Sequence, residues 1–148
     1  MVSVPSTEIQ ETIVGDLMIP GEKVAHVHYK NPLEHALLVL VKTGYSAVPV
    51  LDSNSHFQGI ISKTMIIDRI LGIERFEVEK LSELSVEEAM QKDIPTVTKE
   101  ASFQVGLKLV INHPFVCVVN EDGLFEGILT RRVILKRLNR QLHENKIL

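Results

Sequence analysis

The sequence predicts an α/β (α+β) fold made of two copies of one βαββα unit, because the same stretches recur in the same order. VGDLM at 14–18 matches VEEAM at 86–90, and 32–52 then aligns without a gap on 102–122. After a hairpin turn that we expect to be shorter by two residues in the second copy, 57–71 aligns on 125–139. One copy has too few strands to be stable alone, so we expect the two to pack together with pseudo-twofold symmetry.

The first half of each copy is predicted to be a short strand and a helix. VAHV at 24–27 and IPTV at 94–97 are the expected strands. Leu33, Leu37 and Leu40 recur at helical spacing after Pro32, which suits the start of a helix. Gly44 is placed to end that helix in a left-handed conformation.

The second half of each copy is predicted to be a hairpin followed by a helix. AVPVL and FQGII are short β-rich runs separated by the polar turn DSNSH. Ser62 and Thr130 stand where N-caps are needed, directly before the helical patterns that contain IIDRIL and VILKRL. The stretch 74–84 joins the copies, and Ser85 with Glu88 can form a capping box at the start of the second copy.

Composition indicates a cytoplasmic protein with one well-filled core. The chain has 148 residues, and its apolar runs are too short to span a bilayer, so we expect no membrane partner. Its one cysteine, Cys117, lies in the apolar run FVCVV and is expected to be a buried thiol. Net charge is −3, but six Lys or Arg residues and one acid follow Thr130. This local basic end argues against general nucleic-acid binding and favours a confined anion site or a partner surface.

Catalysis has little support in the sequence. It contains no G-x-S-x-G, H-E-x-x-H, P-loop or Rossmann glycine pattern. His26 and His28 share one face of a predicted strand, but no third ligand of suitable spacing is nearby. We therefore expect no enzymatic activity, no metal site and no cofactor.

The hairpin strands and the residues after them carry a family resemblance. GYSAVPVLD with GIIS in the first copy, and GILT in the second, resemble the CBS-domain pair, or Bateman module. The resemblance covers about 12–142 and implies tandem CBS motifs at 12–72 and 86–142, joined by a linker at 73–85. CBS pairs typically bind adenine nucleotides in clefts between the motifs.

Two positions depart from the family pattern. The acid that usually follows [ST]-x-x and binds the ribose diol is replaced by Met65 and Val133. Losing such a charged hydrogen bond costs roughly 1.5–3 kcal/mol, so AMP and ATP become poorer ligands. A 3′,5′-cyclic dinucleotide has no free diol and carries two phosphates, which Arg131, Arg132 and Lys23 could neutralise.

The segments KVAHV, NPLEHALLVLVKTGY, FVCV, FEGI and TRRV are similar to the stand-alone cyclic di-AMP-binding CBS proteins of Gram-positive bacteria. By position, this resemblance implies ligand-binding residues Lys23, Ala25, Tyr45, Ala47, Pro49, Thr130, Arg131 and Arg132. Tyr45 would stack on a base, the alternative being a tyrosine at the edge of the core. Arg131 and Arg132 would bind phosphate, the alternative being solvated surface charges. A solvated helical face is expected for Lys136, Arg137 and Arg140. A mirror cleft with Ser62, Lys63, Thr64, Pro95 and Phe115 is expected to be weak or empty.

The resemblance also implies partners. The expected protein is a homodimeric sensor that, free of cyclic di-AMP, regulates an enzyme. The (p)ppGpp synthetase/hydrolase of the stringent response is the first candidate, and pyruvate carboxylase is the second. Two alternatives stay open: an AMP- or ATP-binding energy sensor, and a constitutive regulatory subunit with a vestigial cleft.

Overall fold

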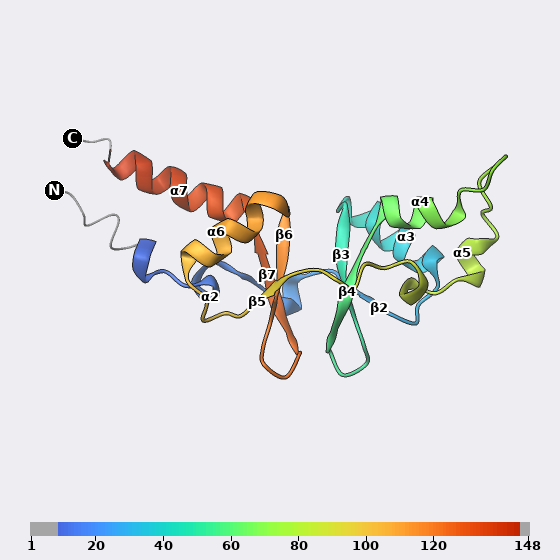
Figure 1. The fold of residues 1–148 in the computed structure, drawn as a ribbon, viewed down its shortest axis with the longest axis horizontal. Helices are drawn as coiled ribbons and strands as arrows, with labels where there is room; N and C mark the ends of the chain where they lie inside the picture. The colour runs from blue at the N-terminus through green and yellow to red at the C-terminus, as the bar shows by residue number, and fades with distance from the viewer. Residues whose placement is uncertain (1–8, 146–148) are drawn as a thin grey trace. The chain divides into compact units, whose positions relative to one another are not determined.

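The computed structural model describes residues 9–145, whose contacts divide them into two compact units (Figure 1). Unit 2 comprises residues 25–94, and unit 1 comprises residues 9–24 and 95–145. Within these residues, no helix is long and apolar enough to cross a membrane.

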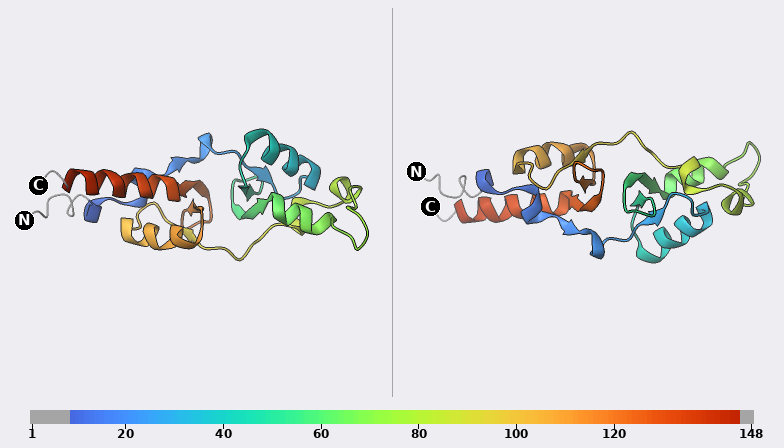
Figure 2. Two further views of the ribbon diagram at one scale, coloured as in Figure 1. Left: turned by 90° about the horizontal axis from the view of Figure 1, so that it is seen from above. Right: turned by 90° about the horizontal axis from the view of Figure 1, so that it is seen from below.

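Unit 2 holds a three-stranded sheet of order β2-β3-β4, with β2 parallel to β3 and β4 antiparallel to it. Helices α3 and α4 lie side by side (Figure 2). Its elements are β2 (Val27–His28), α3 (Leu33–Thr43), β3 (Ala47–Leu51), β4 (Phe57–Ser62), α4 (Lys63–Ile70), α5 (Lys80–Glu83) and the 3₁₀ turn η2 (Val86–Glu88).

Unit 1 repeats this plan in a four-stranded sheet of order β1-β7-β6-β5, again with two neighbouring helices, α6 and α7. Residues 9–11 are also helical. Its further elements are α2 (Val14–Leu17), β1 (Ile19–Pro20), the 3₁₀ turn η1 (Gly21–Lys23), β5 (Thr96–Val97), α6 (Phe103–Asn112), β6 (Phe115–Val119), β7 (Phe125–Thr130) and α7 (Arg131–Asn145). The predicted βαββα order and mixed α/β class are confirmed in both copies.

The predicted helix ends are confirmed. Gly44 has a φ of 78°, and its N–H donates to the carbonyl of Leu40 (3.0 Å). Ser62 Oγ accepts from the N–H three residues later (3.1 Å), and Thr130 Oγ1 does the same in α7 (3.1 Å). The capping box of Ser85 with Glu88 is present, but it begins a 3₁₀ turn instead of an α-helix.

The gapless alignment of 32–52 on 102–122 is wrong at its end. Ala47 pairs with Ser62, and Phe115 pairs with Thr130, so Phe115 corresponds to Ala47 and not to Tyr45. The hairpin loops 52–56 and 120–124 match each other, so the two-residue difference lies before the hairpins. There, α3 has 11 residues followed by 44–46, whereas α6 has 10 followed by 113–114. The error arose because side chains alternate with period two, so a shift of two residues keeps every apolar residue on its face.

The core of each unit contains a residue from the start of the other copy. Val14 is buried in the core of unit 1, and Val86 is buried in the core of unit 2. Backbone hydrogen bonds hold both: the N–H of Val14 donates to Ala101 (2.9 Å) and that of Val86 to Asn31 (2.8 Å). The leading segment of each copy therefore completes the unit that holds the hairpin of the other copy.

Two glycines allow this crossing. Gly127 begins GILT and pairs with Pro20 of β1, and a Cβ at this position would collide with the carbonyl oxygen of Ile19. Gly59 begins GIIS, and a Cβ there would collide with the carbonyl oxygen of Gln91. Each glycine thus removes the side chain that would block a crossing backbone.

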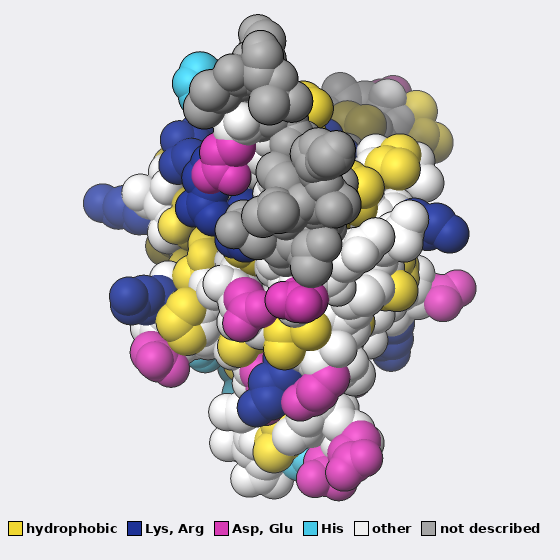
Figure 3. Space-filling model, turned by 90° about the vertical axis from the view of Figure 1, so that its left-hand side faces the viewer, with side chains coloured by type: hydrophobic (Ala, Val, Ile, Leu, Met, Phe, Trp, Pro, Cys, Tyr) yellow, Lys and Arg dark blue, Asp and Glu magenta, His cyan; other side chains and the backbone are white. Residues whose placement is uncertain are grey.

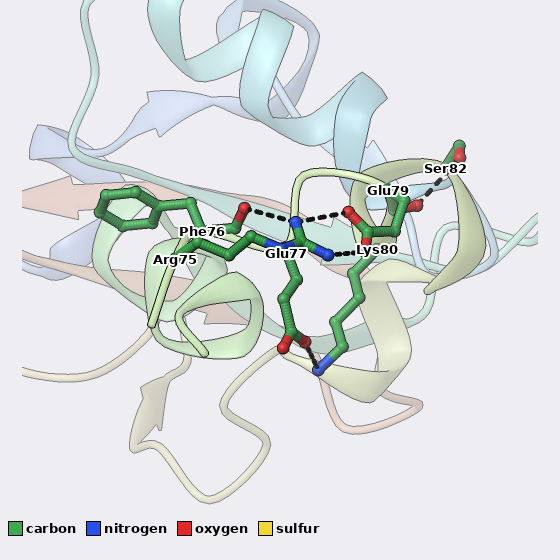
Figure 4. Close-up of polar contacts among 6 residues, drawn as sticks. All are labelled: Arg75, Phe76, Glu77, Glu79, Lys80 and Ser82. Atoms are coloured by element: carbon green, nitrogen blue, oxygen red, sulfur yellow. Dashed lines mark hydrogen bonds and ion pairs between the residues drawn. The ribbon is translucent and has the colours of Figure 1, made fainter. Parts of the chain in front are cut away.

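The linker predicted at 73–85 has structure of its own (Figure 4). It contains α5, and two ion pairs hold its turns: Arg75 with Glu79 (2.7 Å) and Lys80 with Glu77 (2.6 Å). The hydrogen bonds from Arg75 lower the pKa of Glu79 to about 2. The first pair is solvent-exposed and the second is partly exposed, so they order the linker without adding much stability.

Cys117 is buried in β6, as expected, with 2% of its surface exposed. Burial disfavours the thiolate and raises the pKa of this thiol to about 12. Its protonated, enclosed sulfur is consistent with packing in the core.

Candidate functional site

The predicted ligand-binding residues fall into two groups, one in each compact unit. Unit 1 carries Lys23, Thr130, Arg131 and Arg132, and unit 2 carries Ala25, Tyr45, Ala47 and Pro49.

The start of α7 is the most chemically specific part of unit 1. Thr130 ends β7 and caps the helix by accepting from the N–H of Val133, and the N–H of Arg131 donates to the carbonyl of Pro114 (2.9 Å). Two of the first three N–H groups of α7 are therefore satisfied inside the protein. An anion held there would therefore depend chiefly on the positive end of the helix dipole and on the side chain of Arg132. The first turn contains no acidic side chain that would repel such an anion.

The two adjacent arginines have different environments. Arg131 is partly buried, and its Nε donates to the carbonyl of Val110 (2.8 Å) and its Nη2 to that of Ile111 (3.5 Å). These carbonyls lie at the C-terminal end of α6, where a cation is favourable. The alternative that both arginines are solvated surface charges is thus wrong for Arg131. Arg132 is exposed to solvent.

The expected solvated face of α7 is correct for Lys136 and Arg140 but wrong for Arg137. Lys136 and Arg140 are exposed, and Arg140 forms an ion pair with Glu144 (3.7 Å). Arg137 is partly buried, and its Nη2 donates to Thr12 Oγ1 (3.1 Å). The helical period turns Arg137 toward the leading segment that packs on α7.

An open depression of about 450 Å³ runs along the exposed face of α7. Its lining combines three cations with an apolar side chain, Leu135, that is 54% exposed; the cations are Arg131, Arg132 and Lys136. Asn139 completes it. Sequence reasoning missed Leu135 and Asn139, although their positions four and eight residues after Arg131 place them on one helix face. Such a surface suits an anion that also offers an apolar or aromatic part.

Lys23 lies near the strand that leads into α7. It ends η1, which follows β1, and β1 pairs antiparallel with β7. Residues of η1 also contact β7 directly, and the side chain of Lys23 is exposed. Unit 1 therefore carries an exposed ammonium group beside the strand that ends at Thr130.

In unit 2, Ala47 and Pro49 lie on β3, Tyr45 lies between α3 and β3, and Ala25 precedes β2. Ala47 and Pro49 point away from the core that receives Val48 and Val50, because side chains alternate along a strand. Pro49 is buried, and Ala25 packs against the core. Ala47 is partly exposed, and its side chain is only a methyl group.

Tyr45 follows the end of α3 and is 51% exposed. Its N–H donates to Thr43 Oγ1 (3.3 Å), which fixes the backbone before β3. Among the described residues, Tyr45 is not one of those that pack against the core of unit 2. This exposure argues against a tyrosine at the edge of the core and leaves the ring free to stack.

His28, at the start of the first copy, is in ordinary surroundings. His28 stacks on Tyr29 (4.9 Å between ring centroids), and its Nδ1 accepts from the N–H of Lys30 (3.1 Å). Between residues 9 and 145, no group of three or more His, Cys, Asp or Glu side chains is arranged to hold a metal ion.

Comparison with known families explains why the same plan appears twice. Residues 14–72 and 86–140 each match the CBS domain. The chain belongs to the CBS-domain family. The tandem CBS fold expected from GIIS and GILT is thereby confirmed.

Relatives of this CBS pair include named receptors. The chain is 50% identical over 142 residues to cyclic di-AMP receptor B of Bacillus subtilis, which covers 96% of this chain and 97% of the relative. A solved structure of Listeria monocytogenes CbpB in complex with c-di-AMP is 52% identical with a TM-score of 0.83, covering 88% of this chain and 97% of that one. A CBS domain-containing protein of unknown function from Bacillus anthracis is 60% identical with a TM-score of 0.87, covering 92% and 99%. The resemblance to stand-alone cyclic di-AMP-binding CBS proteins is confirmed, and these relatives are named as receptor or CBS-domain proteins, not as enzymes.

The two CBS motifs differ where the first presents small residues. Phe115 takes the place of Ala47 on the outward face of the hairpin, so the second motif has a bulky ring where the first has a methyl group. At the helix start, Lys63 and Thr64 take the places of Arg131 and Arg132, with Ser62 as the cap. The mirror set, which combines Phe115 with Ser62, Lys63 and Thr64, is therefore bulkier and less basic than the set that combines Ala47 with Thr130, Arg131 and Arg132.

Proposed function

We propose that this chain is a non-catalytic receptor that binds cyclic di-AMP through residues of its two CBS motifs. The observation that carries the proposal is the 50% identity to a cyclic di-AMP receptor, which extends over 97% of that relative. The ligand would contact the eight residues that the resemblance implies. The first motif would contribute Lys23, Ala25, Tyr45, Ala47 and Pro49, and the second would contribute Thr130, Arg131 and Arg132.

The side chains at the third position of α4 and α7 support a cyclic dinucleotide over AMP or ATP. Met65 and Val133 occupy these positions, and neither offers a carboxylate to a ribose diol: valine has no acceptor and methionine only a weak thioether. A mononucleotide would bury its two hydroxyl groups without that acceptor, whereas a cyclic dinucleotide has its 3′-oxygens esterified.

The start of α7 supports binding of a phosphate group. Arg132 is exposed beside the capped helix start, and the depression next to it adds the charge of Lys136. Arg131 uses two donor groups on α6, yet a guanidinium carries five N–H donors, so it can still face an anion. Phosphate there would relieve the repulsion between these cations and the helix dipole.

Calorimetry tests the choice of ligand. Cyclic di-AMP should bind at least tenfold more tightly than ATP or AMP at equal salt concentration. Arg132→Met should weaken cyclic di-AMP binding by at least tenfold, because it removes charge-assisted hydrogen bonds worth about 1.5–3 kcal/mol. Arg140→Met is the matched control, since Arg140 lies on the same helix outside the depression. Tighter binding of ATP, or equal losses in both variants, would contradict the proposal.

We infer that the ligand-free form regulates a partner enzyme and that the protein is a homodimer. Exposed apolar side chains on both helix pairs support the dimer, among them Val41 of α3, Ile67 of α4 and Ile111 of α6. Purified (p)ppGpp synthetase/hydrolase should be retained by the immobilised ligand-free protein and released by cyclic di-AMP, because a ligand shifts an equilibrium only through different affinities for its two states. Pyruvate carboxylase should be tested in parallel.

If the enzyme is retained equally with and without cyclic di-AMP, the result would favour a constitutive regulatory subunit over a switch. Light scattering that gives a mass near 16.6 kDa at micromolar concentration would rule out the homodimer.

A further inference from the structure

A second cavity, of about 360 Å³ and partly open to solvent, is formed by unit 1 and shares no lining residue with the depression on α7. Its walls come from the helical residues 9–11, the N-terminal half of α6 and the C-terminal half of α7. One side is apolar and is formed by Ile9, Phe103, Leu107 and Leu138. A volume of this size is within the range of small-molecule sites.

Gln141 forms part of the polar side of this cavity. It lies on α7 with only 6% of its surface exposed, and its Nε2 is buried without a hydrogen-bond partner. A buried donor without an acceptor is unfavourable and uncommon in native proteins. The cavity therefore presents an amide donor that an acceptor on a bound molecule would satisfy.

Arg137 adds positive charge one helical turn before Gln141. Its Nη2 donates to Thr12 Oγ1, which leaves its Nε buried with no acceptor. Residues four apart lie on the same face of a helix, so both unsatisfied donors face the same side of α7. None of the ion pairs formed by the described residues includes Arg137.

The N-terminal end of α6 faces the same cavity. Ser102 caps this 10-residue helix, and Ser102, Phe103 and Gln104 all line the cavity. The first turn of α6 carries no acidic side chain, so the positive end of the helix dipole is not compensated there. The unsatisfied amide of Gln141 and the start of α6 thus give the cavity a free donor and a positive field.

We propose that this cavity binds a small monocarboxylate with an apolar body. The carboxylate would accept from Gln141 Nε2 beside the start of α6, with the positive charge of Arg137 one helical turn away. The apolar body would lie against Phe103, Leu107 and Leu138. An apolar part of about six to eight carbons suits the volume. The site is separate from the proposed nucleotide site, so the two proposals stand or fall independently.

The test uses the full-length, ¹⁵N-labelled protein and two probes of equal length, octanoate and octanamide, below their aggregation limits. Octanoate should shift the amide resonances of Ile9, Gln104, Leu107 and Gln141 in a saturable manner. Octanamide should bind at least tenfold more weakly, because it lacks the negative charge. This comparison needs no variant and so does not depend on a substitution being tolerated.

Gln141→Leu tests the donor directly, because it keeps the side-chain size and removes the unsatisfied amide. Octanoate binding should weaken by at least tenfold, while the melting temperature stays equal or rises. Arg140→Met, on the same helix but outside the cavity, should bind octanoate as the unaltered chain does. Four results would each overturn the proposal: equal binding of both probes, shifts confined to other residues, no shifts at all, or unchanged octanoate binding by Gln141→Leu. An absence of shifts would mean that water alone satisfies these donors.

Discussion

Replacing Gly127 with alanine would place a methyl group against the carbonyl oxygen of Ile19, within 3.3 Å of Pro20 Cα as well. Both obstacles are backbone atoms, so no side-chain rotation relieves the collision, and β1 must move away from β7. Overpacking of this kind costs about 1–3 kcal/mol. Each of the backbone hydrogen bonds lost between β1 and β7 adds about 0.5–1.5 kcal/mol, for a total of about 2–5 kcal/mol. A chain of this length loses about 2–4 °C per kcal/mol, so the melting temperature should fall by about 5–15 °C.

Thermal unfolding followed by circular dichroism measures this effect. Gly44→Asn is the matched control, because a Cβ at Gly44 meets no atom within 4 Å and asparagine tolerates its φ of +78°. The control should change the melting temperature by no more than a few degrees. If Gly127→Ala melted within a degree of the unaltered protein, the argument that a crossing backbone requires this glycine would be refuted.

Three further predictions separate structural from ligand-binding roles. Arg131→Ala should destabilise the protein by about 1–3 kcal/mol, because two carbonyls of α6 lose their donor. Arg132→Ala should leave the melting temperature nearly unchanged and weaken cyclic di-AMP binding. The reverse pattern in thermal melting and calorimetry would contradict these assignments. Thr130→Ala should cost about 1 kcal/mol through loss of the helix cap, which urea titration can measure, and an unchanged midpoint would mean that the cap is dispensable. Burial raises the pKa of the Cys117 thiol to about 12, so this thiol ionises first in the unfolded state as pH rises from about 9. The free energy of unfolding should therefore decrease between pH 9 and 12. Cys117→Ala should lack this part of the decrease, and equal pH profiles for the two proteins would refute the linkage.

The local features of the fold were predictable because they depend on neighbouring residues. The left-handed end at Gly44 and the caps at Ser62 and Thr130 follow from residue type and position alone. The alignment of one hairpin on the other was not predictable in this way. AVPVL and FVCVV keep the same alternation of apolar side chains when one is shifted by two residues against the other. Only the pairing of Phe115 with Thr130 shows which register holds.

The residue types of the candidate site could be predicted from the sequence, but the burial and hydrogen-bond partners of its side chains could not. Its composition follows from the motif, and the exposure of Arg132 agrees with a ligand-facing role. The attachment of Arg131 to Val110 joins residues 21 apart in the chain, and nothing in the local pattern signals it. The burial of Arg137 against Thr12 spans 125 residues and depends wholly on the packing of the leading segment.

That leading segment bears on how such a protein could have arisen. A hypothetical ancestor with one copy would fold its hairpin and helices around a core that lacks the valine now supplied by Val14 or Val86. It could fill the gap only by accepting that segment from a second molecule, as in domain swapping. Duplication within one gene turns this exchange between molecules into an exchange within one chain. The protein then no longer depends on its own concentration to complete its cores, and cutting it in the linker would restore that dependence.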